Sequence, residues 1–216
     1  MKRGLAPRSR RPLLYYITDR KQLSGEPLLA VVHRAIRRRV DFIQIREKDL
    51  PDRNLFELVR RAARLAQGTG TRVLVNGRVD VALASGAHGV HLPAQGLTPR
   101  DVRARVPGRF LVGVSTHSIR EVRRAAQQGA DYALLGPVFP TPSKLQYGEP
   151  LGLDYLRRAC RAVPFPVFAL GGIGPEQVET TLRAGAAGVA GISLFQRILC
   201  ARSHSGLERR HKVAKN

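Results

Sequence analysis

The chain has 216 residues, 43% of them hydrophobic and none of them tryptophan, which suits one α/β domain with an aliphatic core. No apolar run approaches the roughly 20 residues that a membrane-spanning helix needs, so we expect no membrane partner. Cys160 and Cys200 have neither disulfide nor metal-ligand spacing, and no apolar signal follows the basic start. These features predict a cytoplasmic protein in a reducing compartment.

The formal net charge of +21 raises the question of a nucleic-acid partner. Both ends are basic, and the remaining surplus is arginine spread over predicted helix faces, without interleaved aromatic residues or a nucleic-acid motif. We therefore expect no specific nucleic-acid partner. The composition predicts a basic N-terminal extension over residues 1–12, one domain over 13–200, and a basic, disordered tail over 201–216.

In chain order, short apolar runs alternate with amphipathic stretches. The predicted strands are Leu14–Thr18, Phe42–Ile45, Arg72–Val75, Gly89–Leu92, Phe110–Val114, Tyr132–Leu135, Val167–Leu170 and Gly188–Ile192. The predicted helices are Pro27–Arg38, Asp52–Gln67, Arg78–Ser85, Pro99–Val106, Ile119–Gln128, Leu153–Ala162, Pro175–Ala184 and Leu194–Cys200. Eight strand–helix units in a chain of this length predict a single-domain (β/α)8 TIM barrel. An open doubly wound sheet is the alternative, but the first strand lacks the Gly-rich turn of that fold.

Local signals mark several helix ends. Asp52 and Thr98 suit N-cap positions, and Pro99 and Pro175 suit a first helical turn. Glycines are expected just past four helices, at Gly68, Gly86, Gly129 and Gly185. The long connection from Gly136 to Leu151 is rich in Pro, Thr, Ser and Gly, which predicts a lid or binding loop.

Polar residues follow the predicted strands, whose carboxyl ends converge on one mouth of a barrel. The second strand leads into Gln44, Arg46 and Lys48, and the others contribute Asn76, Ser115, His117 and, on the long loop, Lys144. A solvated charge run explains one such cluster but not its repetition at each strand. Arg46, Lys48 and Lys144 suit a polyphosphate. The turns containing Gly171, Gly172, Ile192 and Ser193 suit a phosphate, since loops seven and eight commonly bind one in this fold.

Together these segments resemble the thiamine phosphate synthase and TenI (thiazole tautomerase) superfamily. The resemblance rests on YYITDR, DFIQIREKDL, LVNGRVDVAL, GAHGVHLP, VGVSTHS, GADYALLGPVFPTPSK, ALGGI and AGAAGVAGIS, from about Tyr15 to Ser193. It implies a TIM barrel acting on thiazole phosphate in thiamine biosynthesis. It also implies pyrimidine or diphosphate contacts at Gln44, Arg46, Lys48, Asn76, Ser115 and Lys144, and thiazole-phosphate contacts at Gly172, Ile192 and Ser193.

Two departures from the synthase pattern concern Mg²⁺. The family places a carboxylate directly after Asn76, where this chain has Gly77, and a second one after the fourth strand, where residues 91–97 contain no acid. Asp80 and Asp101, the nearest acids, are predicted on helices. Because Mg²⁺ prefers carboxylate oxygen, these gaps favour the TenI branch. The tautomerases of that branch use a histidine in the loop after strand six, and the matching residue here is Pro137.

These observations order three hypotheses. The first is a TenI-like protein that binds thiazole phosphate and isomerises carboxythiazole phosphate, with His117, Lys144 and Ser115 as candidate catalytic residues; His91 is a further acid/base candidate by location. The second is thiamine phosphate synthase, which condenses hydroxymethylpyrimidine diphosphate with thiazole phosphate and uses Mg²⁺ held mainly by the substrate's diphosphate. The third is a non-catalytic binding or regulatory protein. No cofactor or protein-bound metal is expected unless the second holds, the ligands are small phosphorylated molecules, and a homodimer is left open.

Overall fold

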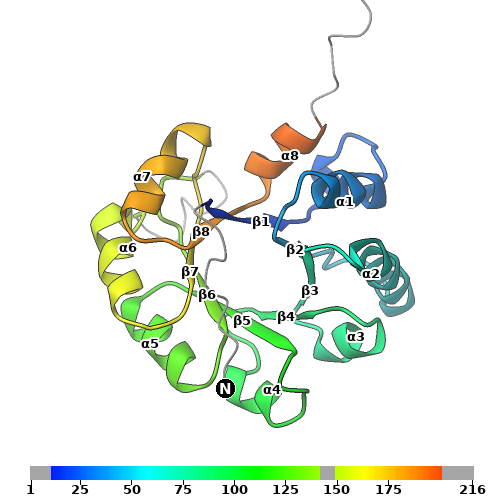
Figure 1. The fold of residues 1–216 in the computed structure, drawn as a ribbon, viewed down its shortest axis with the longest axis horizontal. Coiled ribbons are helices and arrows are strands. Elements are labelled where there is room, and N and C mark those ends of the chain that lie inside the picture. The colour runs from blue at the N-terminus through cyan, green and yellow to red at the C-terminus, as the bar shows by residue number, and fades with distance from the viewer. Residues whose placement is uncertain (1–10, 142–148, 201–216) are drawn as a thin grey trace, which may run out of the picture.

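The computed structural model describes residues 11–141 and 149–200. Eight parallel strands form a closed barrel, and helices surround it (Figure 1). The strands are β1 (Leu13–Ile17), β2 (Phe42–Ile45), β3 (Arg72–Asn76), β4 (Gly89–Leu92), β5 (Leu111–Thr116), β6 (Tyr132–Leu135), β7 (Val167–Leu170) and β8 (Gly188–Gly191). Since β1 pairs with β8 as well as β2, the (β/α)8 prediction is confirmed and the open-sheet alternative is wrong.

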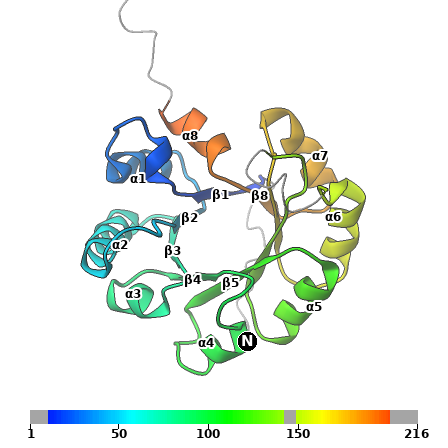
Figure 2. The ribbon, with the colours of Figure 1, turned by 180° about the vertical axis from the view of Figure 1, so that it is seen from behind.

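The helices follow the strands around the ring, which Figure 2 shows from behind. They are α1 (Leu28–Arg37), α2 (Asp52–Ala66), α3 (Val79–Ala84), α4 (Pro99–Arg103), α5 (Ile119–Gln127), α6 (Gly152–Arg161), α7 (Val178–Arg183) and α8 (Ser193–Cys200). Two short 3-10 turns, η1 (Arg20–Gln22) and η3 (Pro175–Gln177), complete the described elements. The sequence missed η1, and it extended α4 to Val106, three residues past its observed end.

Most predicted helix ends are confirmed. Thr98 caps α4 and forms a capping box with Asp101, and the four glycines past helix ends have φ between 73° and 98°. The N-cap prediction for Asp52 is wrong. Pro51 holds that position, and Asp52 is the first helical residue, with its carboxylate ion-paired to Arg78. The expectations for residues 1–10 and 201–216 lie outside the described residues.

An aromatic cluster fills the barrel interior. The rings of Tyr15, Phe42, Tyr132 and Phe168 contact one another pairwise, with centroids 5.5 to 5.9 Å apart. Gly113 makes room for this layer, because a Cβ there would lie 1.9 Å from the Tyr132 ring. Aliphatic residues on the other strand face pack beneath the helices. This aromatic layer of Tyr15, Phe42, Tyr132 and Phe168 lies beneath the polar strand ends, and we call it the barrel floor.

Candidate substrate-binding site at the barrel mouth

Two of the predicted site residues meet directly at the barrel mouth. Gln44 is on β2 and Asn76 ends β3, and both side chains lie toward the barrel interior at the carboxyl ends of neighbouring strands. The Gln44 Nε2 donates to the Asn76 Oδ1 at 2.9 Å. Gln44 is only 2% exposed, whereas Asn76 is partly open to solvent. Gln44 therefore holds the Asn76 side chain in place from inside the barrel, and ligand binding by Asn76 stays a prediction.

Ser115, on β5, connects to the same pair through the barrel floor. Its Oγ lies 2.9 Å from the Nε2 of His91, and the Nδ1 of His91 lies 3.3 Å from the Tyr132 hydroxyl. The hydroxyls of Tyr132 and Tyr15 are 3.0 Å apart, and Tyr15 donates to the Gln44 Oε1 at 3.0 Å. The sequence did not single out either tyrosine, because an apolar strand with an aromatic residue is typical of a core.

The two candidate histidines occupy different environments. His91 is 1% exposed, and burial lowers its pKa to about 3, so it is neutral and enclosed within the floor. His117 is exposed just after β5, with its Nδ1 2.5 Å from the Gly136 carbonyl oxygen and its backbone N–H bonded to Glu121. Of the two, His117 is the histidine that a ligand at the mouth can reach, and its catalytic role stays a prediction.

The charged segment after β2 separates into a structural part and an open part. The buried Glu47 accepts from Thr18 at 2.6 Å and from the Arg20 guanidinium at 3.1 Å. Asp49 pairs with Arg20 and Lys21, and the hydrogen bond from Arg20 contributes most to holding the pKa of this carboxyl well below its usual range.

Arg46 and Lys48 alternate with these acids but do not pair with them. Arg46 is half-buried and Lys48 exposed, and within residues 11–141 and 149–200 neither side chain makes a hydrogen bond or ion pair. The local acids are occupied by Arg20 and Lys21. Within the described residues the charges of Arg46 and Lys48 are thus not neutralised by the neighbouring acids, and anion binding by these two cations stays a prediction. Lys144, the third predicted cation, lies outside the described residues.

The glycine turn after β7 has a packing reason of its own. Gly171 and Gly172 have φ of 95° and 67°, which favours glycine. A Cβ on Gly172 would lie 2.3 Å from the Pro140 carbonyl oxygen, and one on Gly171 would lie 2.7 Å from Pro137. Backbone bonds from Val138 to Leu170 and from Phe139 to Gly171 hold the two loops together. Phosphate binding by these glycines remains a prediction.

The turn after β8 leads directly into α8. Ser193 is the first helical residue and is exposed, while Ile192 is half-buried. The first hydrogen bond of the helix runs from the Gln196 N–H to the Ile192 carbonyl, so the preceding N–H groups are those of a free helix start. Such groups suit a phosphate, and phosphate binding at this turn stays a prediction.

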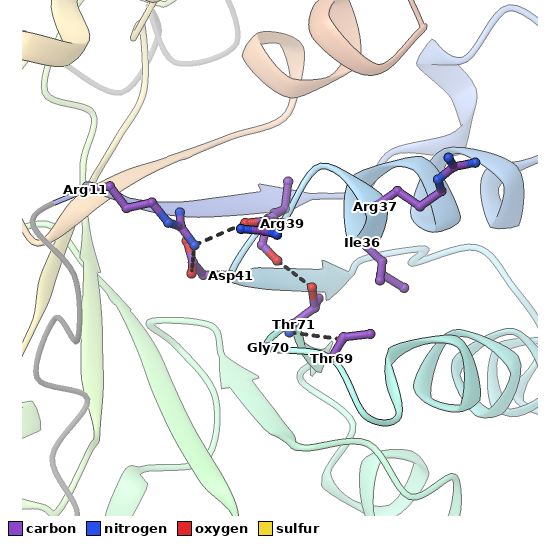
Figure 3. Close-up of a pocket in the computed structure, with 9 residues that line it drawn as sticks. Arg11, Ile36, Arg37, Arg39, Asp41, Thr69, Gly70 and Thr71 are labelled. Atoms are coloured by element: carbon purple, nitrogen blue, oxygen red, sulfur yellow. Dashed lines mark hydrogen bonds and ion pairs between the residues drawn. The ribbon is translucent and has the colours of Figure 1, made fainter.

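A surface pocket of about 350 Å³ lies at the other end of the barrel (Figure 3). It is lined by residues that precede β1, β2 and β3, among them Arg11, Asp41 and Thr71. Arg11 is already paired with Asp41 at 2.7 Å. Because functional groups in this fold gather where the strands end, this pocket is separate from the candidate site.

Comparison with known proteins decides the family. Residues 14–195 match the family described as thiamine monophosphate synthase. The chain belongs to this family.

Curated members of the family cover most of the chain. It is 50% identical over 180 residues to a putative thiamine-phosphate synthase of Geobacter sulfurreducens, covering 83% of this chain and 84% of that protein. A thiamine-phosphate synthase of Roseiflexus castenholzii is 42% identical, with 86% of this chain and 81% of the relative covered. The structure of a thiamine phosphate pyrophosphorylase from Pyrococcus furiosus superposes with a TM-score of 0.76 at 32% identity, covering 87% and 95% of the two chains. These names support the synthase alternative more than the TenI-like first choice.

The two positions where the sequence analysis expected magnesium-binding acids can be located in the structure. Among the described residues no three His, Cys, Asp or Glu side chains cluster as metal ligands. Gly77 occupies the first expected carboxylate position, and Asp101 is used in the cap of α4. At these two positions the described residues therefore offer no free carboxylate to Mg²⁺. No helix of the described part is long and apolar enough to cross a membrane.

Proposed function

We propose that this protein is a thiamine-phosphate synthase, which joins hydroxymethylpyrimidine diphosphate to thiazole phosphate and releases diphosphate. The family membership and the names of its relatives support this reaction over tautomerisation. One observation carries the proposal. Arg46 and Lys48, which have no acidic partner among residues 11–141 and 149–200, lie beside the polar mouth residues Gln44 and Asn76.

The chemistry calls for positive charge near the leaving group. When the pyrimidine C–O bond breaks, negative charge grows on the departing diphosphate, and cations already in place stabilise it. Arg46 can bind phosphate oxygens through two N–H groups, and Lys48 supplies a second positive charge. Lys144 is proposed as a third cation. We assign the thiazole phosphate to Gly171, Gly172, Ile192 and Ser193, and the pyrimidine side to Gln44, Asn76 and Ser115.

One observation favours the TenI-like reaction as a second candidate. The acids that the family uses for Mg²⁺ are missing at Gly77 and after Pro93, and His117 lies next to the loop that contains Pro137. A proton shift on carboxythiazole phosphate needs a positioned acid or base rather than a metal. We propose His117 for that role.

One pair of assays separates these reactions. Purified full-length protein is incubated with thiazole phosphate and hydroxymethylpyrimidine diphosphate, with and without Mg²⁺, and thiamine phosphate is measured. In parallel, hydrogen exchange on carboxythiazole phosphate is followed in D₂O. Thiamine phosphate formation supports the synthase. Exchange without condensation, lost in His117→Ala, would replace it with the tautomerase. Binding of thiazole phosphate with neither reaction would leave a non-catalytic protein and refute both enzymes.

A further inference from the structure

Six side chains form one continuous chain of hydrogen bonds across the barrel floor. It begins at the mouth with Asn76 on β3 and returns to the mouth at Ser115 on β5. The members, in order, are Asn76, Gln44, Tyr15, Tyr132, His91 and Ser115, with successive polar atoms 2.9 to 3.3 Å apart. Only the two end residues are partly exposed. The chain thus links two candidate ligand contacts through four buried side chains.

The first links of the chain set the direction of all the others. Gln44 uses its Nε2 to donate to Asn76, so its Oε1 accepts the hydroxyl proton of Tyr15. A tyrosine hydroxyl has one proton, so the Tyr15 oxygen can only accept from Tyr132. The Tyr132 oxygen must in turn accept from the Nδ1–H of His91.

The direction then passes through the imidazole to the mouth. A neutral histidine protonated at Nδ1 has an unprotonated Nε2, which accepts a hydrogen bond. The Nε2 of His91 therefore accepts the hydroxyl proton of Ser115. The imidazole lies over the Tyr132 ring, with an interplanar angle of 25° and centroids 5.9 Å apart, and its burial keeps it neutral.

We propose that His91 is a positioning residue that fixes the direction in which the Ser115 hydroxyl donates its hydrogen bond. With its proton committed to His91, the Ser115 oxygen can only accept a hydrogen bond at the mouth, while Asn76 keeps its amide N–H groups for donation. The ligand group facing Ser115 must then be a donor. Phosphate oxygens are acceptors, whereas the amino group of an aminopyrimidine is a donor. Ser115 therefore contacts the pyrimidine amine and not the diphosphate, an assignment that rests on the proposed function.

The tautomer of His91, which sets this hydrogen-bond direction, can be measured without enzymatic turnover. Long-range ¹H–¹⁵N correlation spectra of the full chain, labelled at histidine, report which imidazole nitrogen is protonated. We expect His91 in the Nδ1–H form. In Tyr132→Phe the acceptor for this proton is lost, so we expect His91 to change to the Nε2–H form. Tyr15→Phe gives a second route to the same change, because Tyr132 can then donate to His91. An Nε2–H form in the unaltered protein, or a form unmoved in folded variants, would overturn the proposal.

Tyr16→Phe is the matched control for these tyrosine variants. Tyr16 is the next residue on β1 and is equally buried, but it packs against Phe195 of α8, outside the barrel interior, and takes no part in the chain of hydrogen bonds. We expect its His91 signals, and any activity of the protein, to match those of the unaltered chain. A tautomer change in this control would show that the loss of any buried hydroxyl alters His91. That result would refute a specific role for the chain of hydrogen bonds.

A binding measurement tests the ligand side. Isothermal titration is performed with hydroxymethylpyrimidine diphosphate and, separately, with inorganic diphosphate. In Tyr132→Phe the Ser115 oxygen accepts from the His91 Nε2–H, and its freed hydroxyl proton opposes an amine at the mouth. We therefore expect at least a tenfold weaker affinity for the pyrimidine compound and an unchanged affinity for inorganic diphosphate. A loss confined to inorganic diphosphate would place Ser115 on the diphosphate and overturn the assignment. If neither compound binds the unaltered protein, the proposed function and this ligand assignment fail, while the tautomer measurement still decides the role of His91.

Discussion

A carboxylate oxygen of Asp80 lies 2.7 Å from the guanidinium of Arg78, which also pairs with Asp52 at 2.5 Å. The hydrogen bond from Arg78 is the main cause that lowers the pKa of Asp80. Asp80 is the acid nearest in sequence to Gly77, yet it is already neutralised by an arginine. Asp80 is therefore not a free carboxylate that could replace the one missing at Gly77.

Restoring the missing acids should increase any synthase activity and its dependence on Mg²⁺. The double variant Gly77→Asp, Gln95→Asp places carboxylates at both positions. Gly77 has φ of 70°, a conformation that aspartate tolerates better than most residues, and a Cβ there meets Pro93 at an ordinary 3.7 Å. Gln95 is exposed. We expect about a tenfold higher kcat/KM at saturating Mg²⁺, measured as thiamine phosphate formation over a Mg²⁺ titration.

The matched control is Gly77→Asn, Gln95→Asn, which keeps the size and the backbone demands of the double aspartate variant without its charge. We expect this control to show no gain with Mg²⁺. Equal Mg²⁺ curves for the aspartate and asparagine variants would contradict our account of the gap in metal ligands.

Arg46→Gln should weaken binding of the pyrimidine diphosphate. A hydrogen bond to a charged group contributes about 1.5–3 kcal/mol, so the KM for this substrate should rise about 10- to 100-fold. Arg61→Gln, an exposed arginine on α2, controls for the loss of one positive charge. Steady-state kinetics with each substrate varied in turn make the test. Equal effects of the two variants would mean that Arg46 acts only through the overall charge.

Most of the fold could be predicted because the hydrophobic periodicity agrees with the positions of the turn and helix-capping residues along the sequence. The observed β2, β4, β6 and β7 have the predicted bounds, since apolar runs bounded by polar or turn residues define strands sharply. Asp52 was misplaced because its neighbour Pro51 also suits a helix start, and the preference for an acid does not distinguish the cap from the first turn.

The candidate site was predictable only where it depends on strand ends. The strand pattern was enough to place Gln44 near Asn76, because neighbouring parallel strands end on the same side. The roles of Tyr15, Tyr132 and His91 could not be read this way, because an inward-facing polar group within a strand looks like any core residue until its partner across the barrel is known. The same holds for Glu47, whose partners, Thr18 just after β1 and Arg20 on η1, lie 27 to 29 residues away.

Gly172→Ala should destabilise the protein more than a left-handed φ alone explains. The new Cβ would meet the Pro140 carbonyl oxygen at 2.3 Å, so the loop of residues 136–140 must move. Gly68→Ala is the matched control, since Gly68 has a similar φ of 73° and nothing within 4 Å of a Cβ. We expect a loss of about 1 kcal/mol in the free energy of unfolding for Gly68→Ala and a further loss of about 1–3 kcal/mol for Gly172→Ala, measured in urea. Equal losses would show that the two loops do not constrain this glycine.

His91 should make the stability of the protein depend on pH. Its pKa falls to about 3 in the folded chain because the imidazole is fully buried, whereas an unfolded histidine has a pKa of about 6.5. Between these values the unfolded chain binds the extra proton. The stability contributed by keeping His91 neutral is therefore present above about pH 6.5 and declines as the pH falls, by at most about 1.4 kcal/mol per pH unit.

The variant His91→Gln removes this titration and should flatten the acid side of the stability curve. The free energy of unfolding in urea is measured from pH 4.5 to 7.5 for the variant and the unaltered protein, so that contributions common to both cancel in the difference. We expect the advantage of the unaltered protein to shrink steadily below pH 6.5. His33→Gln is the control, because this exposed side chain on α1 meets solvent in both folded and unfolded chains. Parallel curves for His91→Gln and the unaltered protein would mean that His91 accepts a proton in the folded state, which is incompatible with its enclosed position between Tyr132 and Ser115.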